Sequence, residues 1–366
     1  MTSPISIRYP LALLGAAVAV AFLAACAGSD GDDPAAQDMQ RVGLMHVGTD
    51  HIPPSLGSLT TQLANEFGWD VPAAEVNRCV EEKRKRCDFE GKDITLMWRN
   101  LEPEEADAQA EAFVGQGVDV IVAYEDTSIR AAQSATTGHL PATARTRTRI
   151  PVVFLHPSDP VRDGLVKSLS RPGTNLTGVY AARDEVDKQL EIYQRLVPGL
   201  RRMLTLVDPQ DPRTKRLLPG YRAAAAQLAR PIELEIREAS SAEDLKRIFR
   251  SLRPGEVDGA FLMSPRLRLN HSALTIRLAE RARLPVQAHR KEWVEQGALF
   301  SYGIDLPLIG RTGARYVDRI LRGTPPDQLP VEEVPKLEFA INLKTAGKLG
   351  IKVPEDMIIR ADHVYR

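Results

Sequence analysis

Hydrophobic positions in the first half of the chain fall into short runs, separated by amphipathic stretches with helical spacing. The runs cover residues 41–48, 93–100, 118–124 and 150–156, and the acidic stretch 102–117 between two of them has the pattern of a helix. Strands that alternate with helices of about 10 to 16 residues are typical of α/β folds. The pattern therefore predicts a parallel sheet in this half.

The same alternation restarts after a helical pattern at residues 184–200. Apolar runs follow at residues 201–208, 232–239, 259–264 and 284–289. Later segments predict a strand at 298–303, a helix at 306–323, and a strand with a short helix at 336–351. Asn342 is well suited to cap that last helix, because its side chain can accept a hydrogen bond from a free backbone N–H. Two such arrays in 366 residues predict an α/β protein of two Rossmann-like parallel-sheet lobes.

The N-terminus has the pattern of an export signal. Residues 1–26 contain Arg8 as their only charge, and the apolar run that follows is about 15 residues long, short of the roughly 20 that span a bilayer. The run ends in Leu23-Ala24-Ala25-Cys26, which resembles a lipobox and predicts lipidation of Cys26. An ordinary signal peptide and an uncleaved anchor are the alternatives. Residues 27–40 are acidic and small, as expected of a flexible tether.

Charge and cysteine content limit the kinds of molecule and metal that the chain is expected to bind. The 48 basic residues balance 48 acidic residues, so nothing favours nucleic acid or an anionic membrane surface. Cys79 and Cys87 lie in a segment without further metal ligands at suitable spacing. We predict a local disulfide between them, with two free thiols as the alternative, and we expect no metal or cofactor.

One cluster has the residue types of a hydrolase. His156, Ser158 and Asp159 follow the apolar run at residues 150–156. Side chains so close on one extended turn rarely form the Ser-His-acid chain of hydrogen bonds, and Pro157 and Pro160 stiffen the backbone further. The alternative is that Ser158 or Asp159 orders the loop by side-chain turn hydrogen bonds. A third interpretation fits better, since the carboxyl end of a parallel strand is where open α/β sheets bind ligands.

Four blocks, at residues 150–179, 196–212, 297–332 and 336–365, carry a family resemblance. In this order they resemble the bacterial ABC-transporter substrate-binding lipoproteins of the tryptophan/tyrosine-binding-like type. The resemblance implies a type I periplasmic-binding-protein fold, with a multi-crossing hinge and a ligand held between the lobes. By that analogy the N-terminal lobe comprises residues 41–179 and 298–323, and the C-terminal lobe comprises 180–297 and 324–366.

The same resemblance implies a function. We expect a non-enzymatic, monomeric lipoprotein outside the cytoplasm of a bacterium, which captures a small solute and delivers it to an ABC permease. A ligand sensor for a signalling receptor is the alternative, and an extracytoplasmic hydrolase at His156, Ser158 and Asp159 is a remote one.

Strand ends and family motifs suggest the ligand contacts. Helix N-terminal N–H groups with Thr or Ser hydroxyls can bind a carboxylate, although Thr127 could equally be only a helix N-cap. Tyr302 and Asp305 match the family's Tyr-Gly-x-Asp motif, although Tyr302 could belong to the core. The candidate ligand-binding residues are Thr49, Asp126, Thr127, Ser128, Ser158, Asp159, Asn175, Thr177, Asp208, Ser264, Tyr302 and Asp305.

Acidic residues near the predicted cleft bear on the ligand's charge. Glu125, Asp126 and Asp159 would together repel an anion if they faced the cleft. The solute should then carry an amine, as an amino acid or related metabolite does. The alternative is that these carboxylates lie in solvated loops.

Overall fold

The computed structural model describes residues 39–47, 53–82, 84–137, 149–157, 159–181, 186–334 and 337–366. Residues 39–366 form one compact unit built on two sheets. The predicted signal peptide, the tether up to residue 38, Cys26, Thr49 and Ser158 lie outside the described residues. Within the described ranges, no helix is long and apolar enough to cross a membrane.

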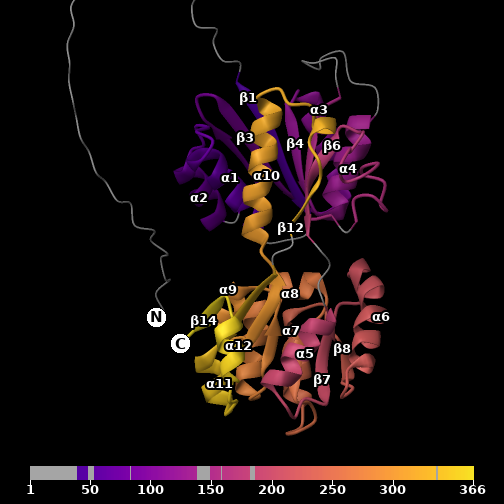
Figure 1. Cartoon of the computed structure of the whole chain (residues 1–366), viewed down its shortest axis with the longest axis vertical. Coiled ribbons are helices and arrows are strands. Elements are labelled where there is room, and N and C mark those ends of the chain that lie inside the picture. The colour runs from indigo at the N-terminus through magenta and orange to yellow at the C-terminus, as the bar shows by residue number, and fades with distance from the viewer. Residues whose placement is uncertain are drawn as a thin grey trace, which may run out of the picture. The chain divides into compact units, whose positions relative to one another are not determined.

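The first lobe is a seven-stranded sheet with helices on both faces (Figure 1). Its pairing is parallel except for β2, which runs antiparallel to β3. The strand order is β12 (Glu332–Val334), β6 (Leu176–Ala181), β5 (Val152–Leu155), β4 (Val120–Tyr124), β1 (Gln40–Val47), β3 (Ile94–Leu101) and β2 (Arg86–Glu90). The helices are α1 (Pro54–Asn65), α2 (Ala73–Glu81), η1 (Pro103–Glu105), α3 (Ala106–Gly115), α4 (Glu125–Thr137), α10 (Leu306–Leu321) and η2 (Pro326–Gln328).

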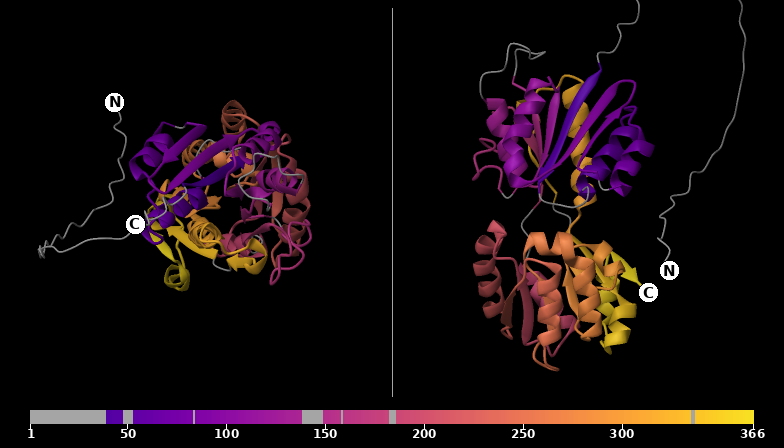
Figure 2. Two further views of the ribbon diagram at one scale, coloured as in Figure 1. Left: turned by 90° about the horizontal axis from the view of Figure 1, so that it is seen from above. Right: turned by 180° about the vertical axis from the view of Figure 1, so that it is seen from behind.

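The second lobe repeats this architecture (Figure 2). Only the β11–β13 pair is antiparallel. The strand order is β14 (His363–Tyr365), β13 (Leu337–Asn342), β11 (Phe300–Ile304), β10 (Val286–Ala288), β9 (Gly259–Leu262), β7 (Arg202–Val207) and β8 (Glu233–Glu238). The helices are α5 (Val186–Leu196), α6 (Pro212–Gln227), α7 (Ala242–Ser251), α8 (Pro265–Arg281), α9 (Lys291–Glu295), α11 (Leu343–Leu349) and α12 (Glu355–Arg360).

Burial of both sheet faces explains the continuous apolar runs in the sequence. In β4, Val120 and Val122 pack into the core beneath α1 and α10, whereas Ile121 and Ala123 pack beneath α3 and α4. Successive side chains of a strand point to opposite faces, so a strand covered by helices on both sides is apolar at every position. The prediction of an α/β fold is thus confirmed at the level of packing.

The chain crosses between the lobes three times, and one predicted segment belongs to the other lobe. We expected residues 298–303 in the first lobe, but β11 pairs with β10 and β13 of the second sheet. Phe300 is fully buried in the second lobe's core, so this strand gains its partners there. The return to the first lobe comes only at Asp305, after which α10 packs on α1.

The segment after α10 also lies in the lobe opposite to the expected one. We placed residues 324–366 in the second lobe, but β12 pairs with β6, and the Thr177 hydroxyl donates to the Leu329 carbonyl at 2.6 Å. The chain therefore stays in the first lobe through Val334, and the second lobe resumes with β13. The described residues change lobe between Ala181 and Val186, at Asp305, and between Val334 and Leu337.

Cysteines 79 and 87 form a disulfide in the first lobe. Their Cα atoms are 6.5 Å apart, and the bond joins α2 to β2. Cys79 is buried in the core that also holds α1 and α10. The disulfide therefore connects the edge strand β2 to the helical layer that contains α1 and α10.

Helix α10 packs closely on α1 because of one glycine. A Cβ atom at Gly310 would lie 1.9 Å from the backbone carbonyl oxygen of Ser55, far inside van der Waals contact. A backbone atom cannot rotate away as a side chain can, so this position requires glycine. The contact fixes the start of α10, and with it the crossing at Asp305.

Gly310→Ala should lower the free energy of unfolding by about 1–3 kcal/mol, the usual cost of overpacking. Urea denaturation followed by circular dichroism measures it. Gly57→Ala in α1 is the matched control, because a Cβ there meets nothing within 4 Å. That variant should be neutral or more stable by about 0.5–1 kcal/mol. Equal midpoints for the two variants would contradict the proposed role of Gly310.

Candidate functional site

Side chains from both lobes and from the second crossing line a cavity of about 70 Å³, here called the cleft pocket. The first lobe contributes residues at the carboxyl ends of β4 and β5, and the second lobe contributes residues that follow β9 and β10. Its lining residues are Tyr124, Glu125, His156, Pro265, Arg268, His289, Arg290, Trp293, Ile304 and Leu306. Carboxyl ends of parallel strands are where open α/β sheets place ligands.

Two residues on the first-lobe side have strained backbones. Glu125 has φ of 64° and His156 has φ of 61°, in the left-handed region that side chains other than glycine rarely adopt. Each comes directly after a strand of the sheet, and each lines the cleft pocket. Such strain of about 1–3 kcal/mol per residue clusters at functional sites.

His156 is not arranged for hydrolysis. Its backbone N–H donates to the Val179 carbonyl at 2.9 Å, and its ring lies 6.0 Å from that of Tyr124. The Asp159 carboxylate instead accepts the Arg162 backbone N–H at 3.0 Å and orders the loop that follows. Among the described residues, no carboxylate contacts His156, so the acid–histidine link of a triad is not formed there.

On the second-lobe side, His289 orients Arg268. The two side chains are joined by a hydrogen bond of 2.6 Å between Arg268 Nη1 and His289 Nε2. A guanidinium can only donate, so His289 Nε2 accepts and the imidazole is neutral. Burial, and then the positive charge of Arg268, hold the pKa of His289 well below its ordinary 6.5. The neutral ring holds the guanidinium at the pocket wall.

Arg290 and Trp293 form the rest of this wall. The guanidinium of Arg290 lies 5.4 Å from the centre of the Trp293 ring, a cation–π arrangement. Neither Arg268 nor Arg290 has a carboxylate within ion-pair distance in the part of the chain that the structure describes. The second-lobe wall therefore has two guanidinium groups without an anionic partner.

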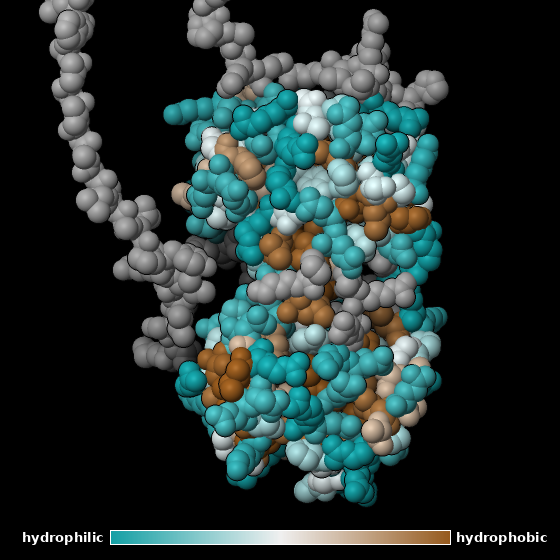
Figure 3. All heavy atoms as spheres, viewed as in Figure 1, coloured by the Kyte–Doolittle hydropathy of each residue, from teal (hydrophilic) through white to brown (hydrophobic). Residues whose placement is uncertain are grey.

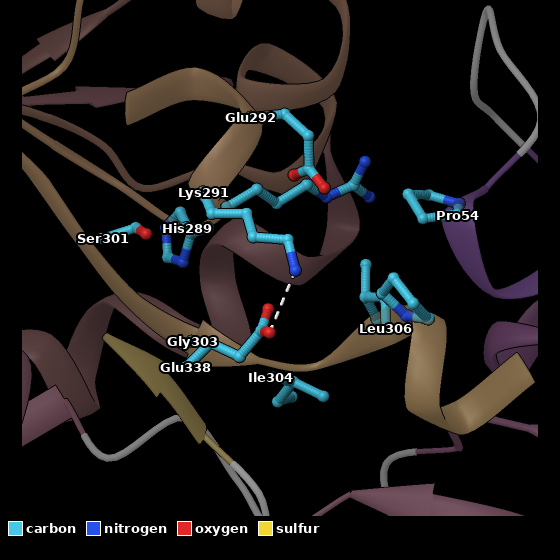
Figure 4. Close-up of a pocket in the computed structure, with 11 residues that line it drawn as sticks. Pro54, His289, Lys291, Glu292, Ser301, Gly303, Ile304, Leu306 and Glu338 are labelled. Atoms are coloured by element: carbon cyan, nitrogen blue, oxygen red, sulfur yellow. Dashed lines mark hydrogen bonds and ion pairs between the residues drawn. The ribbon is translucent and has the colours of Figure 1, made fainter. Parts of the chain in front are cut away.

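A second, adjoining pocket continues the site toward the crossing (Figure 4). It shares His289, Arg290, Ile304 and Leu306 with the cleft pocket. Lys291 points toward Glu338 in this view, and its Nζ lies 3.0 Å from the carboxylate. The His363 ring also contacts Glu338, at 3.3 Å. This cluster is already neutralised by its own ion pair.

The three candidates in the first turn of α4 behave differently. The Asp126 carboxylate lies 3.6 Å from Arg216 of α6, which is an ion pair between the lobes. Thr127 is exposed and is the third residue of α4, so the alternative that it caps the helix is wrong. Ser128 is fully buried, and its hydroxyl makes no hydrogen bond within the described structure. None of the three lines the cleft pocket, whereas their neighbour Glu125 does.

Asn175 and Thr177 have structural roles, contrary to expectation. The Asn175 amide donates to the Thr136 hydroxyl at 2.9 Å and to the Ile150 carbonyl at 2.7 Å. It comes just before β6 begins, which is the opposite end of the strand from the pocket. Thr177 is buried and donates to Leu329, so its hydroxyl holds η2 on the sheet.

Asp208 and Ser264 are also held within the lobe. Both are fully buried, and the Ser264 hydroxyl accepts the Asp208 backbone N–H at 2.7 Å. The Asp208 carboxylate receives Arg266 Nε at 2.5 Å and the Ser240 hydroxyl at 2.8 Å. Both residues lie at the sheet edge that the cleft pocket adjoins, but their side chains connect the loops of that edge to one another. Pro265 and Arg268, just beyond Ser264, reach the pocket.

Tyr302 and Asp305 do not line the cleft pocket either. The Tyr302 ring packs edge-on against Phe339, with centroids 6.2 Å apart, in agreement with the core alternative. Asp305 is buried and caps α10 by accepting the Leu308 N–H at 2.9 Å. Ile304 and Leu306, on either side of Asp305, line the pocket instead.

Sequence reasoning missed the basic side chains of the second lobe. His289 and Arg290 follow a predicted strand in the same way as Asp208, so the strand-end rule would have included them. Arg268 lies in the first turn of α8, four residues after the strand-end residue Ser264. Within the described ranges, no group of three or more His, Cys, Asp or Glu is placed to hold a metal ion.

Comparison with known proteins agrees with this architecture. The family model described as ABC transporter substrate binding protein matches residues 79–365. A tyrosine-binding protein of Clostridioides difficile is 24% identical over 265 residues, which is 72% of each chain. A crystal structure of a conserved domain protein from Vibrio cholerae has a TM-score of 0.66 and 25% identity, covering 89% of this chain and 100% of that one. An ABC domain in complex with L-Trp from Streptococcus pneumoniae has a TM-score of 0.64 and 20% identity, with the same coverage.

The two α/β lobes, with a pocket lined by both and by a crossing segment, define a solute-binding protein of the type I periplasmic-binding-protein fold. The chain belongs to the ABC transporter substrate-binding protein family. Members of this family bind small molecules outside the cytoplasm and work with ABC permeases. They are solute-binding proteins, not enzymes.

The lowered pKa of His289 should appear in the pH dependence of stability. Above pH 6.5 the ring is neutral in both states; below it, the unfolded chain takes up a proton that the folded protein does not. The free energy of unfolding should therefore fall as the pH falls from about 7.5 to 5.5. His289→Gln should flatten that fall, by up to about 1.4 kcal/mol per pH unit below 6.5.

Urea denaturation at several pH values measures this effect. All other titrating groups are common to both proteins, so the difference between the two curves isolates His289. Parallel curves over pH 5.5–7.5 would refute the neutral, desolvated state of this ring.

Proposed function

We propose that this protein captures an α-amino acid with an aromatic side chain in the cleft pocket. The solute's carboxylate faces Arg268 and Arg290, and its amine faces Glu125. The observation that carries the proposal is the separation of charge across the pocket. The first-lobe wall carries the Glu125 carboxylate, and the second-lobe wall carries two guanidinium groups. A zwitterion complements both walls at once.

The guanidinium groups favour a carboxylate on the solute. His289 fixes Arg268 in position and, being neutral, leaves its charge unbalanced. Guanidinium–carboxylate pairs form short, charge-assisted and often bidentate hydrogen bonds. Binding would thus supply the anion that the described residues around Arg268 lack.

Aromatic walls favour a ring on the solute. Tyr124 and Trp293 line the pocket from opposite lobes, and both are almost entirely buried. Aromatic side chains prefer stacked or edge-to-face neighbours, worth about 0.5–1.5 kcal/mol beyond area burial. The relative named a tyrosine-binding protein and the fold neighbour in complex with L-Trp support this class of solute.

Delivery to a permease follows from binding by both lobes. A solute that contacts Arg268 in one lobe and Glu125 in the other stabilises the arrangement in which both contacts form, and shifts the population toward it. The closed arrangement is the species that an ABC permease would recognise. Cys26, in its lipobox-like context, would keep the protein at the outer face of a bacterial membrane.

Arg268→Ala should weaken binding of L-tryptophan or L-tyrosine by about 10- to 150-fold, corresponding to the loss of a charged hydrogen bond. Isothermal titration calorimetry measures the dissociation constants. Arg277→Ala is the matched control, since Arg277 is an exposed residue of the same helix and lies outside the pocket. The proposal fails if the folded wild-type protein binds no aromatic amino acid, or if both variants retain wild-type affinity.

The amine contact has its own test. Indole-3-propionate, which is tryptophan without its amine, should bind the wild type more weakly than L-tryptophan. Glu125→Gln should weaken L-tryptophan binding but leave indole-3-propionate binding unchanged or improved. Equal losses for both ligands would show that Glu125 does not contact the amine.

Cys26→Ser should release the protein from the membrane fraction of cells that express the full chain. Labelling with a radioactive fatty acid should be lost in the same variant, whereas Cys79→Ser should keep the label. Unchanged fractionation and labelling of Cys26→Ser would exclude lipid anchoring at this residue.

A further inference from the structure

The second lobe contains another cavity, of about 160 Å³, that shares no residue with the cleft pocket. We call it the α5/α12 pocket, after the two helices that flank it and lie on one face of the lobe in Figure 1. Its lining residues are Lys188, Glu191, Ile192, Arg195, Tyr302, Leu337, Phe339, Met357, Arg360 and Asp362. The proposed function assigns no role to this cavity.

Described residues that flank each of the three changes of lobe line the α5/α12 pocket. Lys188 lies in the first turn of α5, the first described element after β6 of the first lobe. Tyr302 stands three residues before Asp305, and Leu337 is the first described residue after β12 of the first lobe. A molecule bound here would touch the second-lobe end of every connection between the lobes.

The interior of the pocket suits an aromatic ring. Phe339 and Met357 are buried at its base, beside Ile192, and Tyr302 packs edge-on against Phe339. A cavity of about 150 Å³ with an apolar lining accommodates benzene. The volume of 160 Å³ therefore admits one six-membered ring with its face against apolar side chains.

The charges at the rim suit an anion. Lys188 is paired with Glu191 at 3.2 Å, and Arg195 with Asp356 at 2.5 Å. Arg360 is exposed at the rim, and no carboxylate of the described residues lies within ion-pair distance of it, although its charge adds to that of Arg195 in lowering the pKa of Asp356. The Asp362 carboxylate also lines the pocket and accepts the Phe339 backbone N–H at 2.9 Å. The pocket thus combines an apolar base with one guanidinium that lacks an ion-pair partner.

We infer that the α5/α12 pocket is a second small-molecule site, which takes an aromatic anion and influences the hinge. The ring fills the space over Phe339 and Met357, and the anionic group pairs with Arg360. Binding orders the ends of β11 and β13, because Tyr302 and Leu337 contact the occupant. The α5/α12 pocket is separate from the cleft pocket, and its proposed role does not depend on which solute the cleft pocket binds.

Isothermal titration calorimetry with benzenesulfonate tests the site, because this probe joins a single six-membered aromatic ring to a sulfonate. The folded, full-length protein should bind the probe saturably. Arg360→Glu should raise the dissociation constant at least tenfold. Lys352→Glu is the matched control: it reverses the same charge on an exposed residue of the same lobe that does not line the pocket, and it should change the constant less than twofold.

The absence of saturable binding, or equal effects of the two charge reversals, would overturn the site. Leu337→Trp provides a second test, since a bulky side chain at this partly exposed position should fill the pocket and abolish binding. Thermal unfolding curves of each variant verify that the protein is folded. Probe binding that survives both Arg360→Glu and Leu337→Trp would place the probe elsewhere.

The influence on the hinge has an independent readout. Hydrogen–deuterium exchange should slow in peptides that cover residues 298–306 and 337–342 when the probe is bound to the wild type. The same peptides should be unaffected in Arg360→Glu at the same probe concentration. Unchanged exchange in the wild type at saturation would exclude an effect on the hinge, whatever solute the cleft pocket binds.

Discussion

The crossing at Asp305 is the constraint on which the two-lobed structure depends. Residues up to Ile304 belong to a strand of the second sheet, and residues from Leu306 onward belong to a helix of the first lobe. The buried carboxylate of Asp305 accepts the Leu308 N–H, so the strand ends and the helix begins within one residue. Gly310, one turn further on, lets that helix settle against α1. The residues that flank the cap, Ile304 and Leu306, line the cleft pocket, so the connection that joins the lobes also forms part of the binding site.

The sequence was sufficient to predict the fold class, but not to predict which lobe each segment joins. Apolar runs covered on both faces and amphipathic helices are local patterns, and they are read correctly from composition and spacing. Which sheet a strand joins depends on its partners. Residues 298–303 are as apolar as a strand of either lobe would be, and only the pairing with β10 and β13 places them in the second. The same limit applies to β12, a three-residue strand whose place next to β6 is also fixed by the Thr177–Leu329 hydrogen bond.

The candidate site could also be predicted only in part from the sequence. The rule that ligands bind at the carboxyl ends of parallel strands points to the edge where the cleft pocket lies, and Glu125 and His156 are found there. It could not distinguish a side chain that faces the pocket from one that holds the loops together. Asp208 and Ser264 are buried in mutual hydrogen bonds, whereas Arg268, one turn into α8, reaches the pocket. That difference depends on which partners come within hydrogen-bonding distance after folding, and spacing along the chain does not encode it. The strained backbones of Glu125 and His156 are likewise visible only in three dimensions.

A buried chain of amides in the second lobe runs from the α5/α12 pocket toward the cleft pocket. Gln287 in β10 donates to the side chain of Gln189 at 3.0 Å, and Gln189 donates to the backbone carbonyl of Tyr302 at 2.9 Å. Both glutamines are almost completely buried, where an unmade hydrogen bond costs about 1–3 kcal/mol, so a shift of either residue that breaks their bond is unfavourable. Gln287 stands two residues before His289, which lines the cleft pocket. Gln189 directly follows Lys188, which lines the α5/α12 pocket. The crossing strand β11 is thus tied by its Tyr302 carbonyl to the strand that positions His289 and Arg290. An occupant of the α5/α12 pocket that orders Tyr302 would therefore, through these two bonds, also restrain the strand that ends at the cleft.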